Sequence, residues 1–196
     1  MLPGRRKVGS GRIHGICCAT LFFNITNFEP RKNHGVALEA VAALPDELRQ
    51  KTRLILVGKS AYGSHEQEFR QHLARCGRQI QVDIHQGISE DEKERLFARS
   101  SLLLFPSLAE GFGIPLLEAM QRGLPIVAYD TPIAREICGD GARYIGLNRG
   151  TAFAGAIVDV YKHSVHNMCL AQQGQVRKFA HSQAGDTLAD LLGQIL

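Results

Sequence analysis

Two short segments of the chain concentrate residue types that can bind a phosphorylated ligand. They are residues 26–34, Thr-Asn-Phe-Glu-Pro-Arg-Lys-Asn-His, and residues 106–120, Pro-Ser-Leu-Ala-Glu-Gly-Phe-Gly-Ile-Pro-Leu-Leu-Glu-Ala-Met. Gly111 and Gly113 precede an expected helix, where unpaired backbone N–H groups and the positive end of the helix dipole favour a phosphate. Glycine also lets the phosphate approach the backbone closely. The second segment therefore predicts a phosphate site at a helix N-terminus.

Basic and acidic side chains accompany this expected phosphate site. Arg31 and Lys32 lie just ahead of another expected helix, where two cations could neutralise a diphosphate from the other side. Glu110 falls in the loop and Glu118 falls inside the helix that follows, so both carboxylates can flank the same crevice. A carboxylate beside a phosphate site is not a phosphate ligand, and its natural partners are hydroxyl groups. A ligand with hydroxyl groups at both ends and a diphosphate between them is a nucleotide sugar.

The elements that must position these residues follow from the apolar pattern. Short apolar runs lie at residues 15–23, 54–57, 80–84, 102–105, 126–129 and 143–145. Because they lack a polar alternation, they predict strands that are covered on both faces, as in a parallel sheet. Helical patterns lie between them, at residues 34–44, 66–76, 90–99, 114–122 and 133–137. This order predicts a doubly wound, Rossmann-like α/β fold, in which the loops after the strands form the site.

Local signals mark several helix boundaries and the domain organisation. Ser89 and Glu92 form a capping box, Pro115 lies in a first helical turn, and Gly123 ends that helix. Three amphipathic helices are expected further on, at residues 151–164, 168–179 and 182–196. We therefore expect a disordered basic lead-in over 1–14, a nucleotide-sugar-binding domain over 15–150, and C-terminal helices over 151–196 that pack on that domain.

Composition and charge exclude several classes of protein. The chain has 196 residues, 44% of them hydrophobic and 21% charged, which fits one globular domain and excludes a disordered chain. No apolar run approaches the roughly 20 residues that a membrane-spanning helix requires. The net charge of +4 comes from basic residues that precede Glu29, the first acid, so we expect no basic face for a nucleic acid. Five cysteines without a CxxC spacing favour reduced thiols in the cytoplasm.

The second segment resembles a known family. Its Glu, seven residues, Glu pattern is similar to that of retaining glycosyltransferases with the GT-B architecture, and the surrounding sequence resembles glycosyltransferase family 4, "glycosyl transferases group 1". The resemblance covers about residues 19–145. Further matching segments are Glu-Pro-Arg-Lys-Asn-His at 29–34, Leu-Ile-Leu-Val-Gly-Lys at 54–59 and Thr-Pro-Ile-Ala-Arg-Glu-Ile-Cys-Gly-Asp at 131–140. The resemblance implies the C-terminal, donor-binding half of a GT-B enzyme.

The resemblance also implies a role for each site residue. Lys32 would bind the donor diphosphate with help from Arg31. Glu110 would contact the donor sugar, and Glu118 would hold the ribose hydroxyls. The residues expected along the nucleotide are Gly111, Phe112, Gly113 and Ile114 at the phosphate, where the amides of Phe112 and Gly113 would donate, and Gly87 and Ile88 near the base.

The implied partners and location follow from the same resemblance. The donor would be a nucleotide sugar and the acceptor a saccharide or a lipid-linked saccharide, with no metal and no other cofactor. A separate acceptor-domain chain is a further expected partner. We expect a cytoplasmic protein, with peripheral attachment to the inner face of the membrane as an alternative.

Two departures from the family pattern leave alternatives open. Many members carry a Gly-Arg pair where Thr26 and Asn27 stand, so only Arg31 could supply that charge. The family closes its site between two Rossmann-like domains, and the resemblance covers only the donor-binding one. One hypothesis is the donor domain of a hexosyltransferase, such as a mannosyltransferase, with little or no activity by itself. The other is a non-catalytic nucleotide-sugar-binding subunit or a truncated remnant, while a purely structural domain would bind no nucleotide.

Simpler interpretations remain for several side chains. The two glutamates could be solvated surface charges, and the basic pair could form a solvated turn. His34 fits the start of a helix better than a catalytic role. His163, His166 and Cys169 recur at a spacing that could hold zinc, but no fourth ligand accompanies them.

Overall fold

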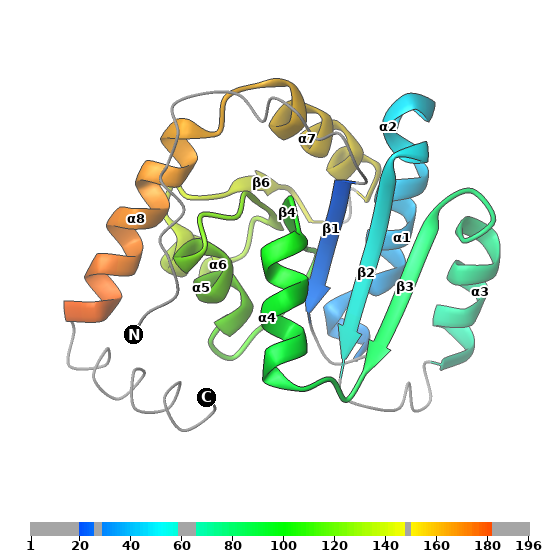
Figure 1. Ribbon diagram of the computed structural model, residues 1–196, viewed down its shortest axis with the longest axis horizontal. Helices are drawn as coiled ribbons and strands as arrows, with labels where there is room; N and C mark the ends of the chain where they lie inside the picture. Colours follow the sequence, from blue (N-terminus) through cyan, green and yellow to red (C-terminus); the bar gives the residue numbers. More distant parts are fainter. Residues whose placement is uncertain (1–19, 26–28, 59–65, 148–149, 182–196) are drawn as a thin grey trace.

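The computed structural model describes residues 20–25, 29–58, 66–147 and 150–181 (Figure 1). The predicted lead-in over 1–14, the predicted helix over 182–196, and Thr26 and Asn27 lie outside the described residues. Residues 15–19 of the first predicted strand lie outside them as well.

A six-stranded parallel sheet forms the centre of the fold, with the strand order β3-β2-β1-β4-β5-β6. The strands are β1 (Thr20–Ile25), β2 (Thr52–Gly58), β3 (Gln81–Gln86), β4 (Leu102–Phe105), β5 (Ile126–Tyr129) and β6 (Arg143–Ile145). Strands β1 and β4 lie in the middle of the sheet. From β1 the chain continues to β2 and β3 at one edge, and from β4 it continues to β5 and β6 at the other edge, so the direction of strand addition reverses between β1 and β4. This is the doubly wound arrangement that the apolar runs predict, and the prediction is confirmed.

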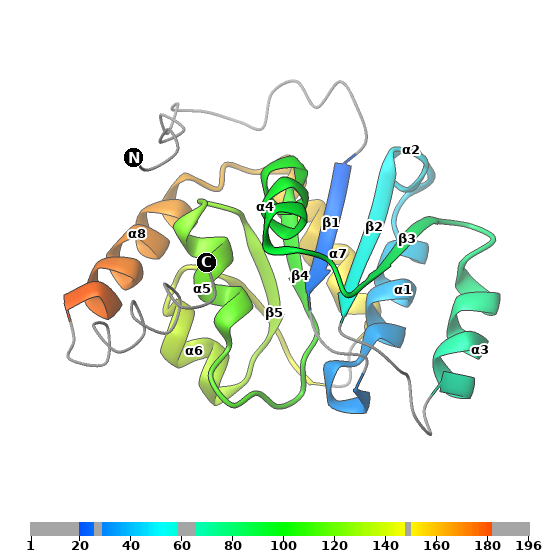
Figure 2. The ribbon, with the colours of Figure 1, turned by 60° about the horizontal axis from the view of Figure 1, so that its bottom comes forward.

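Helices cover both faces of the sheet (Figures 1 and 2). One face packs against α1 (His34–Ala42), α2 (Asp46–Gln50), α3 (Glu66–Cys76) and α7 (Gly150–Lys162). The other packs against α4 (Glu90–Arg99), α5 (Ile114–Gln121), α6 (Pro132–Cys138) and the end of α8 (His166–His181). Alternate residues of β4 belong to different cores: Leu102 and Leu104 face α1 and α7, whereas Leu103 and Phe105 face α4 and α5. Burial of both faces explains the uninterrupted apolar strand sequences.

Strand β3 corrects one expectation. The run at 80–84 was expected to be covered on both faces, but every residue of β3 is exposed or half-buried. The reason is its place at the edge of the sheet, where β2 is its only strand neighbour among the described residues. Arg53 of β2 pairs with Asp83 of β3 at 2.9 Å, a polar cross-strand contact that suits an exposed edge.

Two short helices were not predicted. One is the 3₁₀-helix η1 (Pro30–Lys32), which leads directly into α1, and the other is α2. Between η1 and α1, Asn33 adopts the left-handed conformation with φ of 54°, and its backbone N–H donates to the Pro30 carbonyl at 3.0 Å. Elements of three to five residues carry too short an apolar period to be recognised in a sequence.

The helix signals have the expected effects at two helices. The Ser89 hydroxyl accepts a hydrogen bond from the Glu92 amide at 3.2 Å, while the Glu92 carboxylate lies 3.5 Å from His85 and so does not complete the capping box. Pro115 lies in the first turn of α5, and Gly123, with φ of 63°, follows its end. No helix in the described part of the chain is both long and apolar enough to cross a membrane.

Candidate active site

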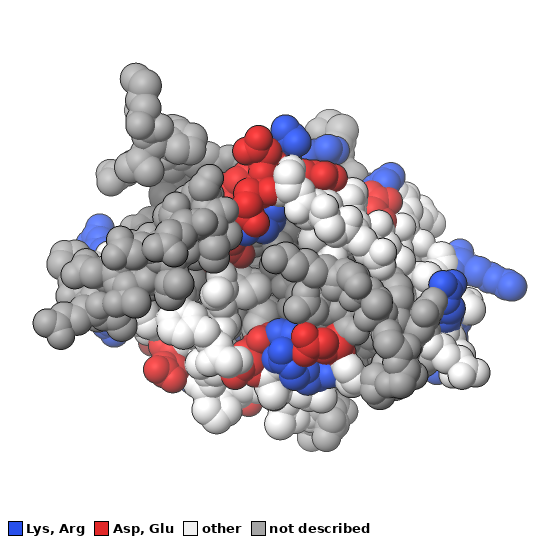
Figure 3. Space-filling model, turned by 90° about the horizontal axis from the view of Figure 1, so that it is seen from below, with Lys and Arg blue, Asp and Glu red and all other residues white. Residues whose placement is uncertain are grey.

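Three loops that follow the carboxyl ends of parallel strands form the candidate site. They lie after β1, β3 and β4, at residues 29–33, 87–89 and 106–113. Figure 3 views the molecule from this side and shows charged side chains of both signs gathered in two places near its middle. In a doubly wound sheet this is the edge at which ligands bind.

The first charged cluster joins η1 to the loop after β4. The Leu108 amide donates to the Arg31 carbonyl at 2.8 Å, so the two predicted segments are in direct contact although they lie far apart in the sequence. The Lys32 ammonium lies 2.5 Å from Glu110 Oε2, and both side chains are less than 10% exposed. Burial makes this ion pair stronger than a surface pair, because water screens it less.

Arg31 belongs to the same cluster but lies nearer to solvent. Its guanidinium is 3.5 Å from Glu110 Oε2, 2.6 Å from Glu29, and donates to the Ala109 carbonyl at 2.9 Å. The side chain is 43% exposed. The predicted grouping of Arg31, Lys32 and Glu110 is therefore present in the structure, with Lys32 as its buried cation.

Glu110 has one oxygen that the surrounding residues leave unsatisfied. Both basic side chains contact Oε2, whereas Oε1 is buried and accepts no hydrogen bond from the described residues. A buried carboxylate oxygen without a donor is costly. A hydroxyl group of a ligand would supply that donor.

His34 begins α1 and lies behind Lys32, 5% exposed, with its ring 6.2 Å from that of Phe69 in an edge-to-face arrangement. Burial, and then the charge of Lys32, lowers the pKa of His34 to about 4. The neutral ring at the start of the helix agrees with the interpretation of His34 as a helix-start residue.

The N-terminus of α5 lies in the same loop as Glu110. Gly113 precedes the helix with φ of 80°, in the left-handed region that favours glycine. A Cβ at Gly111 would meet no atom within 4 Å, so space is open beside this backbone. Phe112 and Ile114 are each about 40% exposed around it. The expected phosphate-binding amides therefore border an open, partly apolar surface.

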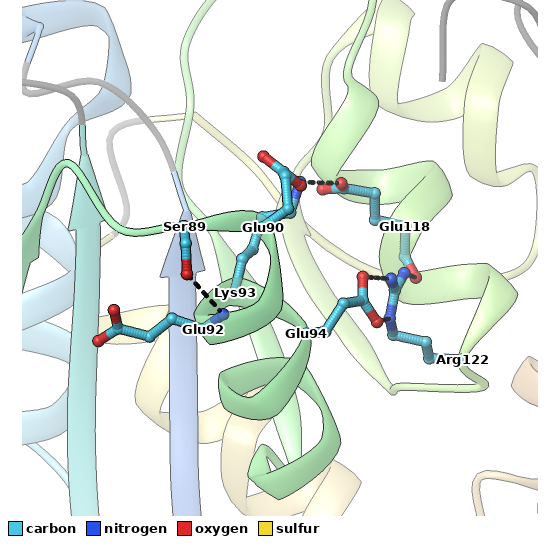
Figure 4. Close-up of polar contacts among 7 residues, drawn as sticks. All are labelled: Ser89, Glu90, Glu92, Lys93, Glu94, Glu118 and Arg122. Atoms are coloured by element: carbon cyan, nitrogen blue, oxygen red, sulfur yellow. Dashed lines mark hydrogen bonds and ion pairs between the residues drawn. The ribbon is translucent and has the colours of Figure 1, made fainter. Parts of the chain in front are cut away.

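The second charged cluster surrounds Glu118 in α5 (Figure 4). Lys93 of α4 lies 2.8 Å from Glu118 Oε1 and also pairs with Glu90, and its side chain is only 14% exposed. Burial by itself would lower the pKa of Lys93, but its hydrogen bonds to Glu118 and Glu90 raise it above the ordinary value. Lys93 is thus a firmly charged partner of Glu118, and the sequence interpretation did not identify it.

Arg122 holds the backbone at the same position. Its guanidinium donates to the Glu118 carbonyl at 2.6 Å, pairs with Glu94 of α4, and lies 4.6 Å from the centre of the Phe97 ring. Figure 4 shows the two cross-helix pairs side by side, one running from α4 to α5 and the other from α5 to α4. The sequence interpretation missed Arg122 as well, because a contact between two helices leaves no spacing signal within either of them.

The loop after β3 places Gly87 and Ile88 beside the end of β2. Gly87 has φ of 61°, and its amide donates to the Gly58 carbonyl at 3.2 Å. Ile88 packs partly against the core beneath α4. These positions are compatible with the expected place near a base, but no contact in the structure tests that role.

The zinc interpretation finds no support. Within the described ranges, no three His, Cys, Asp or Glu side chains gather as a metal site. His163 instead contacts the Asp159 carbonyl at 3.0 Å, and the Cys169 thiol faces the Gly123 carbonyl at 3.8 Å.

Fold, site and sequence together define a class. Residues 19–176 match the family model "Glycosyl transferases group 1", and the chain belongs to that family. The α/β fold matches the C-terminal Rossmann-like domains of GT-B glycosyltransferases.

Two curated relatives are glycosyltransferases of Escherichia coli. The chain is 31% identical over 156 residues to the serotype-specific mannosyltransferase WbdA of Escherichia coli, an alignment that spans 77% of this chain and 19% of WbdA. It is 31% identical over 124 residues to the lipopolysaccharide glucosyltransferase WaaG of Escherichia coli K12, over 63% of this chain and 30% of WaaG.

Solved structures show the same fold. A crystal structure of WaaG superposes with a TM-score of 0.65 at 25% identity, over 88% of this chain and 46% of that one. Anabaena HepE in complex with UDP-glucose superposes with a TM-score of 0.71 at 20% identity, over 90% of this chain and 49% of HepE. The chain thus spans about half the length of these solved structures and a smaller share of the curated relatives.

Proposed function

We propose that this chain is the donor-binding domain of a retaining GT-B glycosyltransferase of family 4, and that it binds a nucleoside-diphosphate hexose. The observation that carries the proposal is the buried Lys32–Glu110 pair beside the N-terminus of α5, with Glu110 Oε1 left without a donor. The cation and the helix N-terminus suit a diphosphate, and the unsatisfied oxygen suits a sugar hydroxyl. The buried oxygen without a donor lies in the same loop as the helix N-terminus, which supports a ligand site there.

Each charged cluster has its own part in this proposal. Lys32, assisted by Arg31, binds the diphosphate together with the amides at Phe112 and Gly113. Glu110 contacts the hexose, and Glu118 accepts hydrogen bonds from the ribose hydroxyls, with residues 87–88 near the base. The ligand therefore runs from the loop after β3, past α5, to η1.

The chemistry is the departure of the nucleoside diphosphate from the anomeric carbon. The bond between that carbon and a diphosphate oxygen breaks, and negative charge grows on the leaving group. The acceptor hydroxyl oxygen forms the new glycosidic bond, and its proton passes to the departing diphosphate. Lys32, Arg31 and the N-terminus of α5 stabilise the growing charge, which is the kind of electrostatic effect that often dominates catalysis. We propose that these groups act without a metal ion.

The relatives favour a class of substrate. WbdA is a mannosyltransferase and WaaG a glucosyltransferase of lipopolysaccharide, so we propose a hexosyl group such as mannose, transferred to a saccharide or a lipid-linked acceptor in the cytoplasm. Transfer is proposed for a protein that also provides the acceptor-binding half, whereas binding of the donor is proposed for the chain itself. A non-catalytic donor-binding subunit would keep the same pocket.

Calorimetric titration of the 196-residue chain with GDP, UDP, ADP and their hexose conjugates tests the proposal. We expect one of the three nucleoside diphosphates to bind more tightly than its monophosphate, which is titrated for comparison, and turnover on simple acceptors to be slow or absent. Failure of all three nucleotides to bind would overturn the proposal and favour a structural domain. Robust turnover by the chain alone would instead show that the acceptor-binding half is dispensable.

A further inference from the structure

Glu118 is held at two points, at its carboxylate by Lys93 of α4 and at its backbone carbonyl by Arg122, which follows α5. Lys93 contacts Oε1 at 2.8 Å, and Arg122, paired with Glu94 of α4, donates to the backbone carbonyl of the same residue at 2.6 Å. Backbone and side chain are therefore fixed together (Figure 4). Among the described residues none donates a hydrogen bond to Oε2, so one oxygen of a fixed carboxylate is left for a ligand.

We infer that Lys93 is a positioning residue that sets the ribose preference of this site. The inference rests on the proposed function, in which Glu118 accepts the ribose hydroxyls. Lys93 occupies Oε1 and keeps Oε2 aimed at the ligand. A carboxylate that is only 11% exposed would, without this cation, lose both its counter-charge and its defined orientation.

The contacts of Lys93 indicate that it positions Glu118 and does not itself bind the phosphates. Its side chain is shared between Glu118 and Glu90, and at 14% exposure it is nearly covered. The cations proposed for the diphosphate contact Glu110 instead, in the other charged cluster. Loss of Lys93 should therefore affect recognition of the ribose and leave the contribution of the diphosphate in place.

The test compares GDP and UDP with their 2′,3′-dideoxy counterparts by titration calorimetry at fixed ionic strength. The measured quantity is the ribose preference, which is the Kd of the dideoxy nucleotide divided by the Kd of the ordinary one. Hydrogen bonds to a charged group predict a preference of about tenfold or more in the unaltered chain. We expect Lys93→Met to remove most of that preference by weakening the ordinary nucleotide, with little change in the Kd of the dideoxy form.

Two further variants keep the result interpretable. Lys93→Arg retains the cation and should retain most of the preference, which a merely structural contact between α4 and α5 would not require. Lys51→Met is the control for removal of a lysine charge, because Lys51 pairs with Glu47 at the exposed end of α2. It should leave both Kd values unchanged. Thermal unfolding of each variant checks that it is folded at the titration temperature. If Lys93→Met does not fold, Lys93→Gln, which also removes the charge but keeps a polar side chain, is titrated in its place and should likewise lose most of the preference.

The outcomes separate the inference from the function on which it rests. If Glu118→Gln removes the ribose preference but the variant that removes the Lys93 charge retains it, Lys93 has no positioning role and the proposed function stands. If the unaltered chain binds both forms of each nucleotide equally, Glu118 does not bind ribose and the inference falls, whereas the proposal of donor binding falls only if neither form binds. Tighter binding of the ordinary nucleotide by Lys93→Met would mean that Lys93 blocks Glu118, which also overturns the inference.

Discussion

Replacement of Lys32 by methionine is the most direct perturbation of the proposed phosphate site. Methionine keeps the length and apolar character of the side chain and removes only the ammonium. Lys32 lies 2.5 Å from Glu110 and is 9% exposed, so a phosphate that replaces or joins Glu110 would meet a cation poorly screened by water. A charge-assisted contact of this kind is worth about 1.5 to 3 kcal/mol, so Kd for the nucleoside diphosphate should rise by about one to two decades.

The same substitution should also lower the free energy of unfolding. Without Lys32, Glu110 becomes a carboxylate that is 7% exposed, with Arg31 at 3.5 Å as its remaining basic partner. Removal of one member of a buried ion pair costs about 3 to 5 kcal/mol. Because Arg31 partly compensates, we expect a loss near the lower end, about 3 kcal/mol, in the free energy of unfolding.

A double variant separates the two effects. Lys32→Met with Glu110→Gln leaves neither charge buried, and we expect it to recover most of the lost stability, to within about 1 kcal/mol of the unaltered chain. Its affinity for the diphosphate should stay weak, because the cation is still absent. Urea unfolding followed by circular dichroism measures stability, and calorimetry with GDP and UDP at fixed ionic strength measures Kd.

The double variant also provides the result that would contradict a phosphate site at Lys32. If the double variant is stable and binds GDP or UDP as tightly as the unaltered chain does, the diphosphate does not lie at Lys32 and the phosphate-site reasoning is wrong. Lys51→Met, at an exposed ion pair, is the control for removal of a positive charge as such. It should change both quantities by no more than a few tenths of a kcal/mol.

Three further expectations follow from the same geometry. Arg31→Ala should weaken diphosphate binding, and its effect should be non-additive with that of Lys32→Met because both cations contact Glu110 Oε2. Glu118→Gln should weaken binding of the free nucleoside diphosphate, whereas Glu110→Gln should spare it and weaken the complete nucleotide sugar. The pKa of His34 falls from 6.5 to about 4 on folding, so the unfolded chain binds the proton more tightly, and stability should fall by up to about 3 kcal/mol as pH drops from 6.5 to 4. His34→Gln should flatten that dependence in urea unfolding.

Each of these measurements has its own control. Equal losses for both ligands in both glutamate variants would contradict the assignment of one carboxylate to the ribose and the other to the hexose. Additive effects of the two basic residues would show that they act on different groups. His163→Gln, at an exposed histidine, is the control for replacing an imidazole by an amide as such.

The fold was predictable where burial fixes the sequence. Strands β4 and β5 are buried at every position, and the apolar runs at 102–105 and 126–129 coincide with them. β3 was predicted to exist but wrongly expected to be covered, because a run of similar composition can occupy the edge of a sheet. Which strand lies at the edge depends on the order of the whole sheet, and no single segment contains that information.

The candidate site was predictable where its residues share one segment or one edge of the sheet. The pattern from Glu110 to Glu118 is local, and the rule that ligands bind beyond the carboxyl ends of strands brings Arg31 and Lys32 to the same edge of the sheet. Lys93 and Arg122 were not predictable in this way. Helix α4 contains many charged residues, which is typical of a helix surface exposed to solvent. Only the packing of α4 against α5 shows that Lys93 and Glu94 contact residues of α5 and its C-terminal end.

The charges of the two clusters nearly cancel within the protein, and this constrains how a ligand could bind. The basic members are Arg31, Lys32, Lys93 and Arg122, and the acidic ones are Glu29, Glu90, Glu94, Glu110 and Glu118, so four positive charges face five negative ones. A diphosphate would therefore meet no strongly positive field at long range. To bind the diphosphate, Lys32 and Arg31 would have to give up their contacts with the Glu110 carboxylate. The hydroxyl groups of the hexose would then donate hydrogen bonds to Glu110 in their place. On this reasoning the complete nucleotide sugar should bind more tightly than the free nucleoside diphosphate, because only its hexose hydroxyls can replace the donors that Glu110 loses when Lys32 and Arg31 turn to the diphosphate.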